Sequence, residues 1–198
     1  DERCFGNTCL AKSASADERC TADTDCLRTE RCVAERCAAL PDDAFGAAVR
    51  ALRDNVAAFN TADVDAFLQF YPEVLSCFWG TSNAPVREER HDPNLPGLRP
   101  LEVTWRLRLA RNQTCLRIRT VTPFVGSTPT DTRVALTVSY VDRTPYYPDG
   151  GFEEKHYLLV RDNPTAPFRV EIETAEKHGD TGNTFPCFTK IQEAVAAP

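Results

Sequence analysis

The chain has 198 residues and a formal net charge of -6, so it lacks the basic surface that nucleic-acid binding requires. Hydrophobic residues make up 42% of it and charged residues 26%, which is typical of folded globular proteins rather than disordered ones. No run approaches the roughly 18 apolar residues of a transmembrane helix. We therefore expect a folded protein with no nucleic-acid partner and no membrane span.

Cysteine usage and the absence of methionine both indicate export. The sequence has nine cysteines, which is typical of oxidising compartments. It has no methionine, and we expect that an export signal ahead of Asp1 has been removed or left out. Lysine is rare beside arginine, a composition typical of GC-rich bacterial coding. We expect an exported bacterial protein of the periplasm, the cell surface or the medium.

Residues 1–40 are predicted to form a small cysteine-rich module. This segment has too few apolar residues for a core of its own, so crosslinks must restrict its unfolded state. An even number of clustered cysteines predicts three disulfide bonds but leaves their pairing open. Zinc is the weaker alternative, because the gaps are mostly longer than the usual two to about four residues and no histidine is near. The six residues are Cys4, Cys9, Cys20, Cys26, Cys32 and Cys37.

The pattern C-x2-D-x-D-C-x5-C-x4-C, at residues 20–37, resembles the short cysteine-rich modules near the start of many bacterial surface lipoproteins and secreted proteins. The resemblance covers this segment alone. It implies an exported protein and is compatible with a lipid anchor ahead of Asp1.

Residues 41–198 are predicted to form a second, larger domain that begins with two helices. Asp42 or Asp43 can cap the first helix. Its apolar stripe recurs at spacings of four and three, and the helix can end at Asn60. A second short helix, starting at Thr61 or Asp63, must stop before Pro72. The stripe of the first helix comprises Phe45, Val49, Leu52, Val56 and Phe59, and that of the second Val64, Phe67, Leu68 and Tyr71.

The apolar period then changes to two, which predicts strands with one covered face. We expect them over 74–80, 101–110, 114–121, 133–141, 152–160 and 168–174, with hairpin turns at 111–114 and 147–151 and a brief terminal turn or helix at 187–195. Helices on one face of an antiparallel sheet make an α+β fold.

Residues 43–176 resemble the opening and strand order of the NTF2-like superfamily, which includes SnoaL-like cyclases and ketosteroid isomerases. The matching parts are the first helix, the passage FNTADVDAFLQFY at 59–71 and the following FWG at 78–80. The resemblance implies a curved antiparallel sheet wrapped around a long helix, with a pocket inside. Similar domains often dimerise through the open face of the sheet. Members include enzymes and non-catalytic binding domains, so fold does not decide function.

The strongest candidate site lies on the predicted strand 152–160. Alternation puts Glu154, His156, Leu158 and Val160 on one face, and we expect that face to point inward with Tyr140. Carboxylate and imidazole are the usual groups for proton transfer, with Trp105 and Tyr140 as pocket walls. A shift of one residue would reverse this assignment, and Tyr157 and Leu159 make that alternative real.

Three cysteines lie outside the small module, and we expect Cys187 to pair with Cys115 or Cys77, which would fasten the C-terminal tail to the sheet. No nucleophile elbow, phosphate loop or metal-binding histidine motif occurs, so no cofactor or metal is predicted. The function we expect is a non-catalytic binding or structural domain that takes a small hydrophobic ligand or a protein partner, with a homodimer through the sheet as one arrangement. The alternative is an isomerase- or cyclase-like enzyme with a pocket acid/base pair.

Overall fold

The computed structural model describes residues 2–5, 8–11, 19–20, 23–27, 29–78, 81–86, 116–142, 152–176 and 185–196. The module holds two hairpins, β1 (Glu2–Phe5) with β2 (Thr8–Ala11) and β3 (Glu30–Val33) with β4 (Arg36–Ala39), and the 3-10 turn η1 (Asp23–Asp25). The larger part contains α1 (Ala44–Asn60), α2 (Val64–Leu68), β5 (Val74–Phe78), β6 (Thr81–Pro85), β7 (Leu116–Pro123), β8 (Arg133–Asp142), β9 (Phe152–Val160), β10 (Arg169–Glu176) and α4 (Phe185–Ala196). The predicted strand 101–110 and the turns at 111–114 and 147–151 lie outside the described residues.

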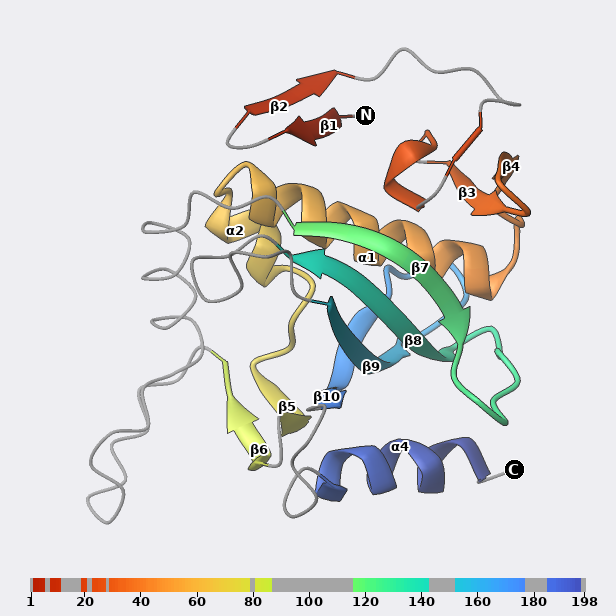
Figure 1. Ribbon diagram of the computed structural model, residues 1–198. Coiled ribbons are helices and arrows are strands. Elements are labelled where there is room, and N and C mark those ends of the chain that lie inside the picture. Colours follow the sequence, from red (N-terminus) through yellow and green to blue (C-terminus); the bar gives the residue numbers. More distant parts are fainter. Residues whose placement is uncertain are drawn as a thin grey trace.

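The larger part is an α+β unit built on one curved sheet of six strands in the order β6-β5-β10-β9-β8-β7 (Figure 1). The predicted meander is confirmed for β7 to β10, which pair antiparallel in chain order. The prediction of a wholly antiparallel sheet is wrong, because β5 joins the outer edge of β10 in parallel through Ile172–Cys77 and Glu173–Phe78. Local alternation does not encode the relative direction of strands so distant in sequence.

Both predicted helices form, and each begins directly after an aspartate that was predicted as its cap. The Asp43 carboxylate accepts a hydrogen bond from the Gly46 N–H at 2.8 Å, and Asp63 accepts one from the Ala66 N–H at 3.0 Å. The chain packs closely at the start of α1, where a Cβ on Gly46 would lie 1.8 Å from the Pro41 carbonyl oxygen. The stripe of α1 is buried except for the half-buried Phe59, and that of α2 is buried except for the half-buried Val64.

The sheet is covered on both faces. The α1 face meets α1 and α2 and forms the larger core, to which the strands contribute Leu75, Ala84, Ile118, Val121, Val134, Leu136, Val138, Tyr140, Tyr157, Leu159 and Val170. The outer face meets α4, which Figure 1 shows on the opposite side of the sheet from α1. The second core between α4 and the sheet comprises Cys77, Phe124, Ala135, Leu158, Ile172, Cys187 and Ile191.

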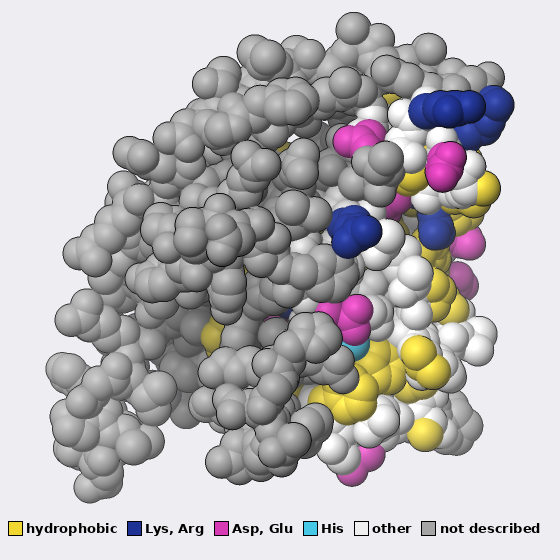
Figure 2. All heavy atoms as spheres, viewed as in Figure 1, with side chains coloured by type: hydrophobic (Ala, Val, Ile, Leu, Met, Phe, Trp, Pro, Cys, Tyr) yellow, Lys and Arg dark blue, Asp and Glu magenta, His cyan; other side chains and the backbone are white. Residues whose placement is uncertain are grey.

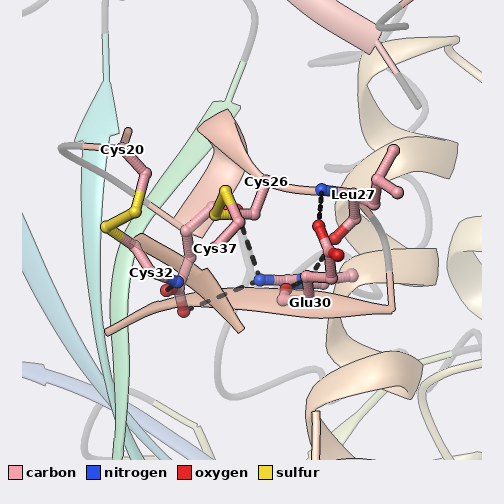
Figure 3. The surroundings of a disulfide bond; sticks show 8 residues. Cys20, Cys26, Leu27, Glu30, Cys32 and Cys37 are labelled. Atoms are coloured by element: carbon pink, nitrogen blue, oxygen red, sulfur yellow. Dashed lines mark hydrogen bonds and ion pairs between the residues drawn. A yellow bond between two sulfur atoms is a disulfide. The ribbon is translucent and has the colours of Figure 1, made fainter. Parts of the chain in front are cut away.

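Three disulfide bonds lie among the described residues. Cys20–Cys32 and Cys26–Cys37 crosslink the module (Figure 3), which confirms pairing within it for these four cysteines. Cys77–Cys187 ties α4 to β5 and confirms that the tail is fastened to the sheet. Cys4 and Cys9 are direct partners in the β1–β2 ladder, but their side chains, like the whole of Cys115, lie outside the described residues.

A zinc site in the module would have to use sulfur atoms that belong to the disulfide bonds. The Sγ atoms of Cys20, Cys26 and Cys37 lie within 4.8 Å of one another. All three are bonded in disulfides, and a disulfide sulfur cannot act as the thiolate that zinc requires. The clustering therefore reflects two crosslinks in contact, packed where the module has almost no apolar side chains.

The module docks on α1 through Arg53. The Arg53 guanidinium donates to the carbonyl oxygens of Leu27, Glu30 and Asp23, and it lies 3.7 Å from the Asp23 carboxylate. That carboxylate is buried and also accepts the Cys32 N–H at 2.7 Å. Burial raises the pKa of Asp23, and its hydrogen bond to Cys32 and the charge of Arg53 oppose the rise. One nearly buried side chain thus contacts three carbonyl groups of the module, and two of them, those of Asp23 and Leu27, also accept backbone N–H groups within the module.

We predict that residues 41–198 fold without the module. All the buried residues of the larger core except Leu40 lie within 41–198, whereas the buried cluster of the module consists of cysteines. A chain that starts at Pro41 should show a single cooperative thermal transition. It should also carry Arg53→Met, since the guanidinium would lose its buried acceptors. Arg53→Met in the full chain is the control and should melt as cooperatively as the wild type. If it does so and the truncated variant melts without cooperativity, the module is part of the same folding unit.

Candidate functional site

The predicted pair Glu154 and His156 does not share a face with Tyr140. In the β8–β9 ladder, Tyr140 lies opposite Glu153 and Leu136 lies opposite Tyr157, whereas Thr137 lies opposite His156. Tyr140 and Tyr157 therefore belong to the α1 face, and Glu154 and His156 to the outer face. The predicted common inward face is wrong, and Trp105 lies outside the described residues.

The physical reason is that β9 is buried on both sides. Leu159 packs into the core under α1, while Leu158 packs into the core under α4. Apolar residues therefore occur on both faces of β9, and alternation along the strand cannot show which face points inward. The shift of one residue that the sequence left open is the arrangement that occurs.

The interior of the α1 face instead contains a charged group that the sequence did not indicate. Glu173 of β10 is fully buried, with 0% of its surface exposed. One carboxylate oxygen accepts a hydrogen bond from the Tyr71 hydroxyl at 3.0 Å, and the other accepts one from the Lys155 ammonium at 3.1 Å. The Lys155 side chain is only 13% exposed, so a nearly buried ion pair crosses from β9 to β10.

A pair of tyrosines lies beside this ion pair. The Tyr140 and Tyr157 hydroxyl groups are 3.0 Å apart and hydrogen bonded to each other, and both rings are buried. The Lys155 ammonium lies 5.7 Å from the centre of the Tyr140 ring, within the range of a cation–π interaction. We call Tyr71, Tyr140, Lys155, Tyr157 and Glu173 the interior cluster.

The surroundings keep the phenols of Tyr71 and Tyr157 protonated. Burial raises the pKa of Tyr71 well above its usual value, and the neighbouring Glu173 charge raises it further. Burial likewise raises the pKa of Tyr157, with Glu173 and Tyr140 adding to the rise. The interior cluster therefore offers protonated hydroxyl groups next to a compensated charge pair. It can donate hydrogen bonds to a carbonyl or hydroxyl group, but its carboxylate is already held by two donors.

An irregularity in β10 explains why sequence reasoning missed Glu173. Plain alternation would put Val170 and Glu173 on opposite faces. A β-bulge between Val170 and Ile172 shifts the register, so Val170 pairs with Leu159 and Glu173 pairs with Tyr157 on the same face. No residue type in β10 predicts the bulge. Lys155 could have been assigned to the α1 face from the sequence, because it alternates with the buried Tyr157 and Leu159 on β9.

The outer face places His156 in an aromatic setting. Its ring is buried and lies 5.4 Å from the Phe124 ring and 5.0 Å from the Phe188 ring, both near edge-on. Its Nδ1 is hydrogen bonded to the Thr137 hydroxyl at 3.1 Å, and its Nε2 lies 3.8 Å from a Glu154 carboxylate oxygen. The predicted carboxylate and imidazole are thus neighbours, but under α4 rather than inside the curved sheet.

A shallow cleft of the larger part lies elsewhere, between α1, α2 and the chain before β10. Its lining includes Asn55, Asp63, Phe70 and Phe168. Asn55 is buried and donates to the Phe67 carbonyl oxygen at 2.9 Å, so its amide serves the α1–α2 contact. None of the predicted site residues lines this cleft.

None of the helices in the described ranges is long and apolar enough to cross a membrane.

No family model matches the chain, and no curated protein matches it. Among solved structures, the chain is similar to the X-ray crystal structure of RV0760c from Mycobacterium tuberculosis in complex with estradiol-17beta-hemisuccinate. The identity is 9% and the TM-score 0.40, over 66% of this chain and 93% of that one.

Proposed function

We propose that the protein is an exported, non-catalytic binding protein that holds a small, mainly apolar molecule on the α1 side of its curved sheet. The interior cluster anchors one hydroxyl or carbonyl group of this ligand. In this proposal the fold is an NTF2-like cone, and residues 1–40 form a separate crosslinked module. The three disulfide bonds support an oxidising compartment.

The observation that carries the proposal is the buried charge pair. Glu173 and Lys155 lie beside the buried apolar and tyrosine side chains of the larger core. Removing two charges from water costs several kcal/mol, and a hydrophobic pair of similar volume is often as stable or more so. Such polar groups among apolar side chains are typical of binding sites, where a few polar atoms orient the ligand.

The arrangement of donors favours binding over the isomerase-like alternative. A general base needs a carboxylate that can approach the substrate proton. Both oxygens of Glu173 already accept hydrogen bonds, from Tyr71 and Lys155. The Tyr140–Tyr157 pair, in contrast, can exchange its mutual hydrogen bond for one to a ligand at little cost.

The test uses 2-naphthol, a rigid apolar phenol whose fluorescence reports binding. We expect saturable binding, and Tyr140→Phe and Tyr157→Phe should each weaken it about 5- to 10-fold, the equivalent of one hydrogen bond. Thr122→Ala, on an exposed part of β7, is the control and should bind like the wild type. Equal affinity of all four proteins, or no binding by the wild type, would contradict the proposal.

A further inference from the structure

We propose that the outer face of the sheet carries a site for a divalent transition-metal ion, with His156 Nε2 and the Glu154 carboxylate as its protein ligands. The site is separate from the interior cluster, because the two residues lie on the opposite face of β9. Figure 2 shows a histidine and an acidic side chain next to a group of hydrophobic side chains on one surface of the molecule.

The two ligand atoms already lie at nearly the required separation. Glu154 and His156 are two residues apart on one strand, so both side chains project from the same face. Their Oε1 and Nε2 atoms are 3.8 Å apart. A tetrahedral zinc ion with bonds of about 2.0–2.1 Å needs about 3.4 Å between two such ligands. The Glu154 side chain is 32% exposed and can close this difference by a small rotation.

The imidazole is oriented as metal-bound histidines are. A ligating histidine usually directs its other ring nitrogen to a hydrogen-bonding partner, which sets the tautomer and the ring direction. Here the Thr137 hydroxyl lies 3.1 Å from Nδ1. With the proton on Nδ1, the Nε2 lone pair points to Glu154. The flanking Phe124 and Phe188 rings hold the imidazole in place.

A buried hydroxyl group adds an independent indication of a ligand. Ser139 lies directly opposite Glu154 in the β8–β9 ladder and is 4% exposed. Among the described residues, its Oγ is buried without a hydrogen-bond partner. Such a group is costly unless something binds to it. A water bound to the metal would supply that partner, and further waters would complete the coordination.

The test is calorimetric titration of the oxidised full chain with zinc chloride at pH 7.5. We expect one ion per chain, and about 10-fold or greater loss of affinity in Glu154→Gln and in His156→Gln. Glu154→Gln keeps the test interpretable if the buried histidine variant does not fold, since Glu154 is partly exposed.

The matched control replaces the other two histidines, as His91→Gln/His178→Gln, and should bind zinc like the wild type. Ser139→Ala should weaken binding less than Glu154→Gln does. Unchanged affinity in the folded Glu154→Gln variant, loss of binding in the His91/His178 control, or absence of zinc binding by the wild type would each overturn the proposal.

Discussion

Replacing Glu173 by alanine should lower the free energy of unfolding by about 3–5 kcal/mol, the usual cost of leaving one member of a buried ion pair alone. The Lys155 side chain, which is only 13% exposed, would lose its counter-charge, and the Tyr71 hydroxyl would lose its acceptor. The loss approaches the whole stability of a typical domain. Urea unfolding followed by far-UV circular dichroism measures it.

Two further variants separate the charge from the volume. Glu173→Leu combined with Lys155→Met removes both charges and should recover most of the stability, because no unpaired ion is left. Glu171→Gln is the control on the same strand, where the half-buried Glu171 carboxylate accepts a hydrogen bond from the Ser76 hydroxyl at 3.3 Å. A loss below about 1 kcal/mol for Glu173→Ala would show that the ion pair is not held inside the core.

Removing the Cys77–Cys187 bond should cost about 4–5 kcal/mol, because it closes the longest loop among the described disulfides. The two residues are 110 positions apart, and the cost of the missing crosslink rises with loop length in the unfolded chain. Both residues are fully buried in the core beneath α4. Alanine at both positions should therefore loosen α4 as well as lower global stability.

The experiment compares Cys77→Ala, Cys187→Ala and the double variant by urea unfolding. Each single change already breaks the bond, so the losses should be similar and far from additive. Hydrogen exchange should become faster in α4 first. Cys20→Ala/Cys32→Ala is the control, since it opens a separation of only 12 residues within the module and should leave α4 protected. Equal protection of α4 in the Cys77→Ala/Cys187→Ala variant and the wild type would contradict the prediction.

The homodimer was expected to form through an open face of the sheet, but α4 covers part of the outer face. This helix lies on the outer face, tied down by the disulfide at Cys187 and by Ile191 in the second core. Lys190 adds hydrogen bonds to the Ser76 carbonyl oxygen and the Ser82 hydroxyl. A dimer through that part of the sheet would have to displace the helix, so the homodimer stays a prediction without structural support.

Much of the local structure was predictable because its causes are local. Asp43 and Asp63 cap helices a few residues away, and the spacing of Val49, Leu52 and Val56 marks one side of α1. The shortage of apolar residues in the first 40 positions predicted crosslinks there, and two disulfides among the described cysteines agree. Each of these features depends on residues that lie close together in the chain.

The candidate sites depended on which face of β9 meets which helix, and that could not be predicted. Leu158 and Leu159 are both buried, so the alternating pattern is symmetric until α1 and α4 take their places on opposite faces. The bulge before Ile172 then turns Glu173 inward to meet Lys155 and Tyr71, which come from distant parts of the chain. The sequence by itself determined the helix caps, the apolar periodicity of helices and strands, and the crosslinks of the module. Only tertiary packing decided where the interior cluster and the Glu154–His156 pair lie, because strand periodicity does not distinguish two faces that are both covered.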